Sequence, residues 1–376
     1  MALGEHDPDW LDFYDGPPGW VADIRRRPPA LPQIKDAAAA LIVQLQANPE
    51  HLPAARVDFL VKQLKAIEVR VDLLSGIRRG FDEEADAFFG IRVPPFEDAQ
   101  RLSAVRAEIA RLLPGSGPLE RRYAAFDEKF LIPPDRLPAV MDRAIEACRA
   151  RTLRHLPLPA GEKISVEYVS DKPWSAYSYY QGGFRSRIEI NTDFPLTVDR
   201  ALQLACHETY PGHHAYNSLA ESRLVIDKRL PEFTVQPAFS PQSFLSESMA
   251  SVAAEVAFPA PDRLAFERDQ LFPPAGLNPK EAEHYLRVEA LVDQLEIAQV
   301  PIARRYLDGQ LDFVRAETAL EDQALMAHSD VTLKYLNEFR TYMLCYTEGR
   351  RRLQACLRSP DPWARYRDLI ASQPYR

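Results

Sequence analysis

The chain has 376 residues, with 46 Lys and Arg against 54 Asp and Glu, so its formal net charge is −8. Apolar residues make up 46% of it, which is enough to bury a sizeable core in one large domain or two. The acidic balance excludes a basic footprint for nucleic acid or an anionic membrane, and no stretch approaches the length of a membrane span.

The first third of the chain has the apolar spacing of α-helices, with large side chains recurring every three or four residues. Pro-Pro and Pro-Gly pairs separate the periodic stretches. The spacing predicts helices over 34–48, 54–79, 97–113 and 135–152. We therefore predict an N-terminal helical region over residues 1–160 and a second region over 161–376, either as two units or as one continuous domain.

The pattern then changes to that of strands. Residues 164–169 and 186–191 alternate with period two, and residues 177–180 between them are rich in strand-forming Tyr. These stretches predict a small antiparallel sheet of about three strands. We expect 186–191 to be the edge strand, where unpaired backbone groups can bind an extended peptide. An ordinary strand without a ligand is the alternative.

An octapeptide with one carboxylate and three imidazoles follows the sheet: His207-Glu208-Thr209-Tyr210-Pro211-Gly212-His213-His214. The chain has only eight His, so a chance cluster is a poor explanation. A helix that ends in His-Glu and is followed by another His is how zinc peptidases hold their ion, and the Glu takes a proton from the activated water. The octapeptide predicts a metal site with His207 as a ligand and Glu208 as general base.

The spacing within the octapeptide is unusual. Zinc peptidases usually place their two His four residues apart, roughly 6 Å along a helix axis. Here Pro211 cannot continue the helix ladder and Gly212 tolerates unusual dihedrals, so we predict a kink or a looped-out pair. Such a loop would bring His213 to the position of the usual second ligand. His214, which a straight helix would align with His207, stays the alternative.

Helical spacing resumes after residue 215, and it predicts helices over 244–258, 279–308, 310–327 and 331–357. A catalytic zinc ion needs a third protein ligand. Glu247 is the first candidate, because the small side chains around it would let its helix approach the octapeptide closely. Glu255 on the same helix is a weaker candidate. An exposed Glu in a pair along the helix is the alternative for Glu247.

The last long helical stretch carries candidate groups for binding and catalysis. Tyr342 and Tyr346 share a helix face, and Tyr346 first, then Tyr342, can donate to a developing oxyanion. A Tyr stripe of this kind is also typical of a core. Arg340 and Arg350 can bind a substrate carboxylate in a bidentate manner, and Asn191 at the end of the strand is a further candidate for substrate binding.

The four cysteines are Cys148, Cys206, Cys345 and Cys356, and they have no CxxC spacing. We expect them to be reduced and mostly buried, and we do not expect Cys206 to bind metal. The first seven residues lack the basic and apolar regions of a signal peptide, so a cytoplasmic protein is expected.

The octapeptide resembles the HExxPGHH signature of a bacterial family named domain of unknown function 885. That family is regarded as related to helical zinc metallopeptidases of the gluzincin type, which have a downstream Glu ligand. The resemblance extends to Tyr179–Gly183, Arg187–Thr192 and Tyr346–Gly349, and it covers roughly residues 160–350. Residues 247–250 read Glu-Ser-Met-Ala where the family has Glu-Gly-Trp-Ala.

The resemblance implies a mainly α, multi-helix zincin-like fold with a small antiparallel sheet before the metal-binding helix. It implies a zinc-dependent hydrolase, a metallopeptidase acting on short peptides, with His207, His213 and Glu247 on the ion. Binding of a substrate carboxylate by Arg340 and Arg350 would make this enzyme a carboxypeptidase or dipeptidase. His/His/Glu sites accept other divalent ions too. A metal-dependent hydrolase of a non-peptide amide or ester, or a catalytically silent helical metal-binding protein, are the alternatives.

Overall fold

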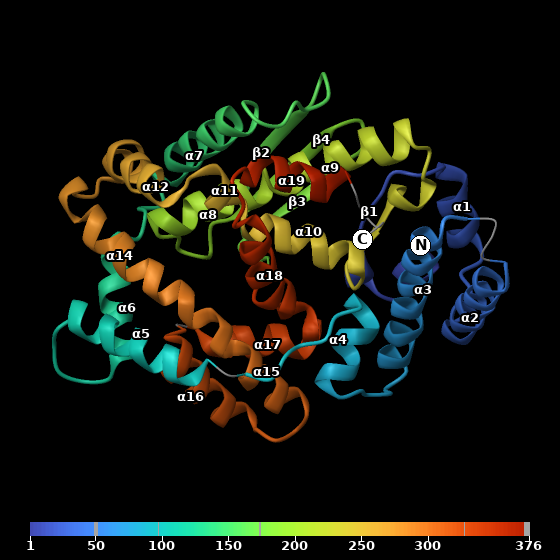
Figure 1. Cartoon of the computed structure of the whole chain (residues 1–376), viewed down its shortest axis with the longest axis horizontal. Coiled ribbons are helices and arrows are strands. Elements are labelled where there is room, and N and C mark those ends of the chain that lie inside the picture. The colour runs from blue at the N-terminus through green and yellow to red at the C-terminus, as the bar shows by residue number, and fades with distance from the viewer. Residues whose placement is uncertain (49–51, 97, 173, 327, 372–376) are drawn as a thin grey trace.

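The computed structural model describes residues 1–48, 52–96, 98–172, 174–326 and 328–371. It is mainly helical, as predicted, with little sheet (Figure 1). The strands are β1 (Leu11–Tyr14), β2 (Lys163–Val169), β3 (Ala176–Tyr180), β4 (Arg185–Asn191) and β5 (Val235–Pro237). The helices up to the sheet are α1 (Pro18–Arg26), α2 (Leu31–Ala47), α3 (Ala54–Leu74), α4 (Phe81–Phe89), α5 (Ala99–Leu112), α6 (Leu119–Asp127) and α7 (Leu137–Thr152).

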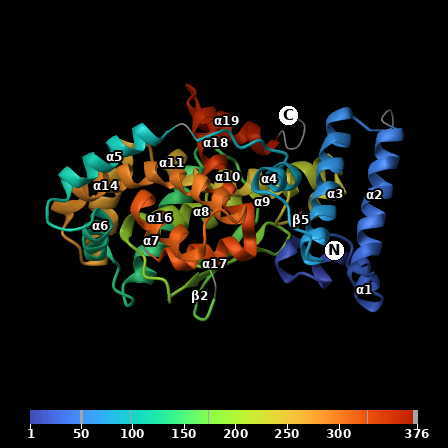
Figure 2. The same ribbon diagram turned by 90° about the horizontal axis from the view of Figure 1, so that it is seen from below.

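The helices after the sheet form the rest of the molecule. They are α8 (Val198–Glu208), α9 (His213–Ala220), α10 (Pro241–Ser251), α11 (Ala253–Ala257), α12 (Ala260–Phe266), α13 (Phe272–Ala275), α14 (Ala282–Val292), α15 (Gln299–Leu307), α16 (Phe313–Ala324), α17 (Ser329–Phe339), α18 (Glu348–Leu357) and α19 (Pro362–Ala371). Figure 2 shows α2 and α3 side by side at one end of the molecule and α5, α6 and α14 at the other.

The four helices predicted in the first third are present as α2, α3, α5 and α7. The predicted helix over 244–258 is α10 and α11, which a break at Val252 separates. The helix predicted over 310–327 is α16. Residue 97 of one predicted helix and residue 327 of another lie outside the described residues.

Two of the predicted long helices are interrupted. The stretch 279–308 contains α14, a 3-10 segment Asp293–Ala298, and α15. Pro301 in the first turn of α15 has no N–H to donate to the carbonyl four residues earlier, which accounts for the irregular turn before it. The stretch 331–357 contains α17, a 3-10 segment Arg340–Cys345, and α18. Its break is at Arg340, whose φ of 52° leaves the helical region.

The predicted three-stranded sheet lies before the octapeptide, with strand order β2-β4-β3. β3 and β4 are antiparallel, as expected, but β2 and β4 are parallel, so the sheet is mixed. The prediction that 186–191 forms the edge strand is wrong, because β4 is hydrogen-bonded on both sides. Its alternating Ile188 and Ile190 are buried, as is typical of a central strand. The outer strands of this sheet are β2 and β3.

A second, two-stranded antiparallel sheet joins β1 near the N-terminus to β5. The sequence pattern did not predict it, because both strands are very short. The register shifts between Leu11 and Phe13, so the intervening residue, Asp12, lies at a bulge. Bulges often redirect a side chain. This sheet brings β1, near the start of the chain, beside β5, which packs against α10.

The hydrophobic core is shared by distant parts of the chain. One cluster combines residues of α5 and α7 with residues of β4, α8 and α14, and another combines α3 and α4 with α15 and α17. Both clusters draw residues from each side of position 160, and the division there stays a prediction. None of the described helices combines the length and the apolar character that a membrane crossing requires.

The expectation of four reduced cysteines is wrong for two of them. Cys148 on α7 and Cys206 on α8 form a disulfide, with Cα atoms 5.7 Å apart. They are 58 residues apart in sequence and meet only because α7 packs along α8, so spacing could not reveal the pair. Cys345 and Cys356 are free. The disulfide excludes Cys206 as a metal ligand and ties α7 to the helix that carries His207.

Candidate metal centre

The octapeptide forms the end of one helix, a tight loop and the start of the next helix. α8 ends at Glu208, and α9 begins at His213. The Tyr210–Pro211 peptide bond is cis. The N–H of Gly212 donates to the carbonyl of Cys206 at 3.0 Å, which folds the loop back over the end of α8. The looped-out Pro-Gly pair expected from the sequence is therefore present.

The conformation of this loop requires glycine at position 212. A Cβ atom at this position would lie 1.9 Å from the carbonyl oxygen of His207 and 2.4 Å from that of Cys206. Both contacts are with backbone and are too short for any side chain. The absence of a side chain at Gly212 lets the chain pass close enough to the helix end to return His213 toward His207.

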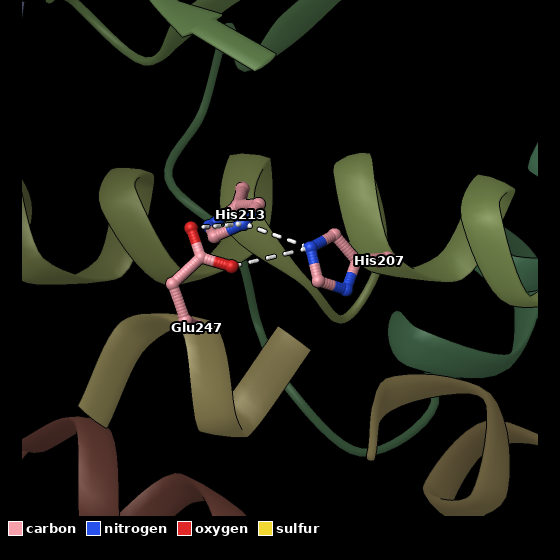
Figure 3. A group of neighbouring side chains, drawn as sticks. All are labelled: His207, His213 and Glu247. Carbon is pink, nitrogen blue, oxygen red and sulfur yellow. Dashed lines mark hydrogen bonds and ion pairs between the residues drawn. The ribbon is translucent and has the colours of Figure 1, made fainter. Parts of the chain in front are cut away.

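Three side chains converge where the loop meets α10. The Nε2 atoms of His207 and His213 are 3.2 Å apart. Glu247 places Oε1 3.3 Å from His213 Nε2 and Oε2 3.5 Å from His207 Nε2. Figure 3 shows the two imidazoles, from α8 and α9, and the carboxylate, from α10, directed toward one point. Among the described residues, this is the group of ligand-type side chains whose atoms lie close enough to share an ion.

These separations match those of a bound divalent ion. Ligand atoms that hold zinc at about 2.0–2.1 Å in tetrahedral geometry lie about 3.3–3.4 Å from one another. Glu247 Oε2 is buried and has no hydrogen-bond partner among the described residues. Two imidazole nitrogens and a carboxylate therefore face one another around a single point. Lone pairs arranged in this way are stabilised by a cation.

Neighbouring hydroxyl groups fix the orientation of His213 and Glu247. Ser246 Oγ lies 3.3 Å from Nδ1 of His213. The hydroxyl of Tyr342 donates to Glu247 Oε1 at 3.1 Å, and Ser243 Oγ lies 3.2 Å from the same hydroxyl. Tyr342 was predicted as an oxyanion donor, but its only proton is directed at Glu247. It orients that carboxylate.

The charges in the centre shift the pKa values strongly. Burial lowers the pKa of His213, but the carboxylates of Glu247, Glu208 and Asp12 together outweigh burial and raise that pKa to about 9. Burial also opposes the ionisation of Glu247, yet His213 and His207 hold its pKa well below the usual range. Protons and metal ions compete for the same lone pairs, so an environment that favours positive charge here also favours a bound cation.

Glu208 lies beside the centre without joining it. Its Oε1 is 4.0 Å from His207 Nε2, too far to complete the convergent group yet within reach of a water molecule in the space between. The side chain is buried, and burial raises its pKa. This position suits a carboxylate that accepts a proton from water.

Tyr346 lies between the centre and a pocket. Its ring is 6.2 Å from the ring of His207, and the side chain is half-buried. The same residue lines a pocket of about 300 Å³. The pocket is formed by residues of α5, α11, α14, the segment after α14 and α18. Of the two predicted tyrosines, Tyr346 is therefore the one that a substrate in this pocket can meet.

His214, the alternative ligand, points elsewhere. It is fully buried, with Nδ1 2.8 Å from Ser186 Oγ and Nε2 2.9 Å from Glu162 Oε2. Both ring nitrogens are occupied, so His214 has no lone pair to offer to the ion. Consecutive residues of a helix point about 100° apart, so His213 and His214 cannot share one site.

The two arginines predicted to bind a substrate carboxylate are already paired. Arg340 is buried and donates through Nε to Glu84 at 2.6 Å. Arg350 lines the pocket beside Tyr346, but it binds Glu255, Asp293 and Glu296. Both guanidinium groups are therefore already bound to carboxylates of the protein and are not placed to bind the carboxylate of a substrate. Glu255, the weaker candidate ligand, is engaged by Arg350 as well.

Asn191, the third predicted substrate-binding residue, is fully buried at the end of β4. Its amide donates to the carbonyls of Lys172 and Trp174 at 2.9 and 3.0 Å. Its Oδ1 accepts the N–H of Asp193. The side chain holds the loop before β3 and presents nothing to a ligand.

The sequence pattern did not identify Asp12, a carboxylate close to the centre. It accepts hydrogen bonds from the hydroxyl of Tyr177 at 3.0 Å and the amide of Gln236 at 3.3 Å. Burial raises the pKa of Asp12 to about 6, and the nearby carboxylate of Glu247 adds to the effect. No local signal marks Asp12, because only the pairing of β1 with β5 brings it here.

No family model matches the chain, and no curated protein does. Among solved structures it is similar to the "putative lipoprotein" from Colwellia psychrerythraea, with a TM-score of 0.55 and 16% identity, over 84% of this chain and 58% of that one. The chain thus spans less than two thirds of that protein. A second similar structure is the M32 carboxypeptidase from Deinococcus radiodurans R1, with a TM-score of 0.42 and 15% identity, over 94% of this chain and 71% of that one. The first of these likenesses shows a shared fold and nothing further.

Proposed function

We propose that this chain is a metal-dependent hydrolase, a metallopeptidase of short peptides with zinc as its first candidate ion. The proposal depends on one observation above all. The Nε2 atoms of His207 and His213 lie 3.2 Å apart, and each lies 3.3–3.5 Å from a different carboxylate oxygen of Glu247, so the three side chains surround one point. The octapeptide resemblance supports the same assignment, and manganese or cobalt would fit the same ligands.

A catalytic metal site differs from a structural one in the number of its protein ligands and in the groups beside them. Structural zinc sites use four protein ligands, whereas catalytic sites use three and leave a position open. Here three side chains converge, and the carboxylate of Glu208 stands outside this group, 4.0 Å from His207 Nε2. A centre that only stabilised the fold would have no need of this buried group.

When bound, a divalent cation lowers the pKa of a water molecule toward about 7 and polarises a carbonyl oxygen. The carboxylate of Glu208 takes a proton from the attacking water, whose oxygen forms the new bond to the carbonyl carbon. The raised pKa of Glu208 keeps that proton long enough to pass it to the leaving nitrogen as the C–N bond breaks. The hydroxyl of Tyr346 donates to the oxygen that gains charge.

The pocket beside Tyr346 supports a small substrate. Its volume of about 300 Å³ is at the lower end of the range for ligand pockets, and it has room for a short peptide segment but not a folded chain. Arg340 and Arg350 are both committed to carboxylates of the protein. We therefore propose a short peptide or small amide as substrate, and we do not retain the carboxypeptidase or dipeptidase assignment that depended on these arginines.

The test combines metal analysis with a digest of a peptide library by the wild type and by Glu208→Gln. The expected result is one divalent ion per chain in both proteins, with cleavage by the wild type alone. Cleavage by Glu208→Gln at the wild-type rate, or a wild type that binds no ion, would contradict the proposal. If the ion binds and no peptide is cleaved, a panel of esters and non-peptide amides decides between another substrate and a silent metal-binding protein.

A further inference from the structure

The second His of the octapeptide has a defined environment that metal binding does not explain. His214 is fully buried, and each ring nitrogen has its own partner. Nε2 lies 2.9 Å from Glu162 Oε2, and Nδ1 lies 2.8 Å from Ser186 Oγ. A buried imidazole with both nitrogens satisfied is held in one orientation.

Glu162 binds both sides of the octapeptide loop. Its Oε2 accepts from the hydroxyl of Tyr210 at 2.6 Å as well as from His214. Tyr210 precedes the Pro-Gly pair and His214 follows His213, so the two contacts enclose the loop that places His213. Arg149 donates to the other oxygen, Oε1. These donors outweigh the effect of burial and lower the pKa of Glu162 to about 2.

The groups that hold Glu162 and His214 belong to the rigid part of the fold. Glu162 lies directly before β2, and Ser186 lies on the central strand β4. Arg149 lies on α7, next to Cys148, whose disulfide partner Cys206 adjoins His207. The loop is thus fastened both to the sheet and to the helix that is covalently joined to α8.

We propose that Glu162, acting through Tyr210 and His214, is a positioning residue of the metal centre. We call Glu162, Tyr210 and His214 the loop clamp. Between α8 and α9 the chain runs through a four-residue loop, Thr209 to Gly212, which would otherwise have several conformations. With Tyr210 in the loop and His214 just after it fixed to one carboxylate, the chain presents His213 Nε2 at 3.2 Å from His207 Nε2 before any ion arrives. Ligands fixed in advance bind an ion without losing conformational entropy at that moment.

The loop clamp deepens the proposed function and depends on it, because it has a role only if the centre binds an ion. Its physical consequence is specific. The glutamine in Glu162→Gln has one carbonyl oxygen and one NH₂ group, so it loses either the contact with Arg149 or the contacts with Tyr210 and His214, and with them the negative charge that all three groups face. None of the three ligand atoms would be removed. Partners that orient metal ligands typically contribute about 10–100-fold to metal affinity.

The test measures the affinity for Co²⁺ and the visible absorption of the Co²⁺ protein, for the wild type and for Glu162→Gln. We expect the affinity of Glu162→Gln to fall about 10–100-fold and its cobalt bands to change, because His213 is no longer fixed. Tyr210→Phe, which removes one of the two flanking contacts, should give a smaller effect of the same kind. Glu167→Gln is the matched control: Glu167 lies on β2 and pairs with Arg187, but its side chain is 51% exposed and outside the loop clamp.

The outcomes separate the loop clamp from the function on which it depends. A wild type that binds no Co²⁺ overturns the metal centre itself. A wild type that binds Co²⁺, with Glu162→Gln and Tyr210→Phe equal to Glu167→Gln in affinity and spectrum, overturns the loop clamp alone. If Glu162→Gln does not fold, Tyr210→Phe decides by the same two readouts. A merely structural Glu162 would lower thermal stability and leave the cobalt spectrum of the folded protein unchanged.

Discussion

Substitution of Gly212 by alanine should disrupt the metal centre more than any change of similar size elsewhere. The added Cβ would lie 1.9 Å from the carbonyl oxygen of His207, and moving that contact to the 3.0 Å minimum that real Cβ atoms keep requires about 1.1 Å of displacement. The obstacle is backbone at the end of α8, so the loop has to move away from it. The displacement passes directly to the next residue, His213.

The magnitude follows from this geometry. A shift of about 1 Å in a positioned group can lower the activity of a site about 100-fold. Overpacking lowers the free energy of unfolding by about 1–3 kcal/mol or more. We expect Gly212→Ala to weaken ion binding at least about 100-fold and to lower the melting temperature. Ion affinity is measured by competition with a chromophoric chelator, and stability by thermal unfolding followed by circular dichroism.

The matched control is Gly19→Ala. A Cβ at Gly19, on α1, would meet no atom within 4 Å, and alanine favours a helix over glycine. Its ion affinity should equal that of the wild type and its stability should be equal or slightly higher. If Gly212→Ala binds the ion as tightly as Gly19→Ala does, the loop does not set the position of His213 and the reasoning is refuted.

Tyr346→Phe should lower kcat about 10²–10³-fold on any substrate found and leave ion affinity unchanged, because it removes a donor to the reacting oxygen; steady-state kinetics that show an unchanged kcat would exclude that role. Tyr342→Phe removes the hydroxyl that donates to Glu247 Oε1, so ion affinity should fall about 10-fold in a chelator competition. Equal affinity would mean that Glu247 needs no such support. Arg340→Ala removes the ion-pair partner of the buried Glu84, so the free energy of unfolding should fall by about 3–5 kcal/mol in a urea titration. Ion affinity of the folded Arg340→Ala protein should be unchanged, and a large loss would show that Arg340 belongs to the centre after all.

The sequence allowed prediction of features that depend on neighbours along the chain. Helical spacing located α2, α3, α5 and α7, because their apolar faces repeat every three or four residues. The looped-out Pro211-Gly212 pair could be predicted because proline and glycine act on the backbone locally. The break at Arg340 could not, since the helical spacing continues through it and the distortion accompanies an ion pair with Glu84, 256 residues away.

Features that depend on how distant segments pack together could not be predicted from the sequence. The central position of β4 follows from strand order, which period-two alternation does not encode. The Cys148–Cys206 disulfide and the approach of Asp12 depend on which helices and strands pack together. In the centre itself, the sequence identified the group His207, His213 and Glu247 as candidates. It could not show that Arg350 is surrounded by three carboxylates.

The central claim is that one divalent cation is shared by His207, His213 and Glu247. X-ray diffraction from crystals grown with one equivalent of zinc, recorded on both sides of the zinc absorption edge, tests it most directly. We predict a single strong anomalous peak about 2.0–2.2 Å from Nε2 of both imidazoles and from a carboxylate oxygen of Glu247. An anomalous map without density at this point, or with the zinc bound by other residues, would contradict the claim.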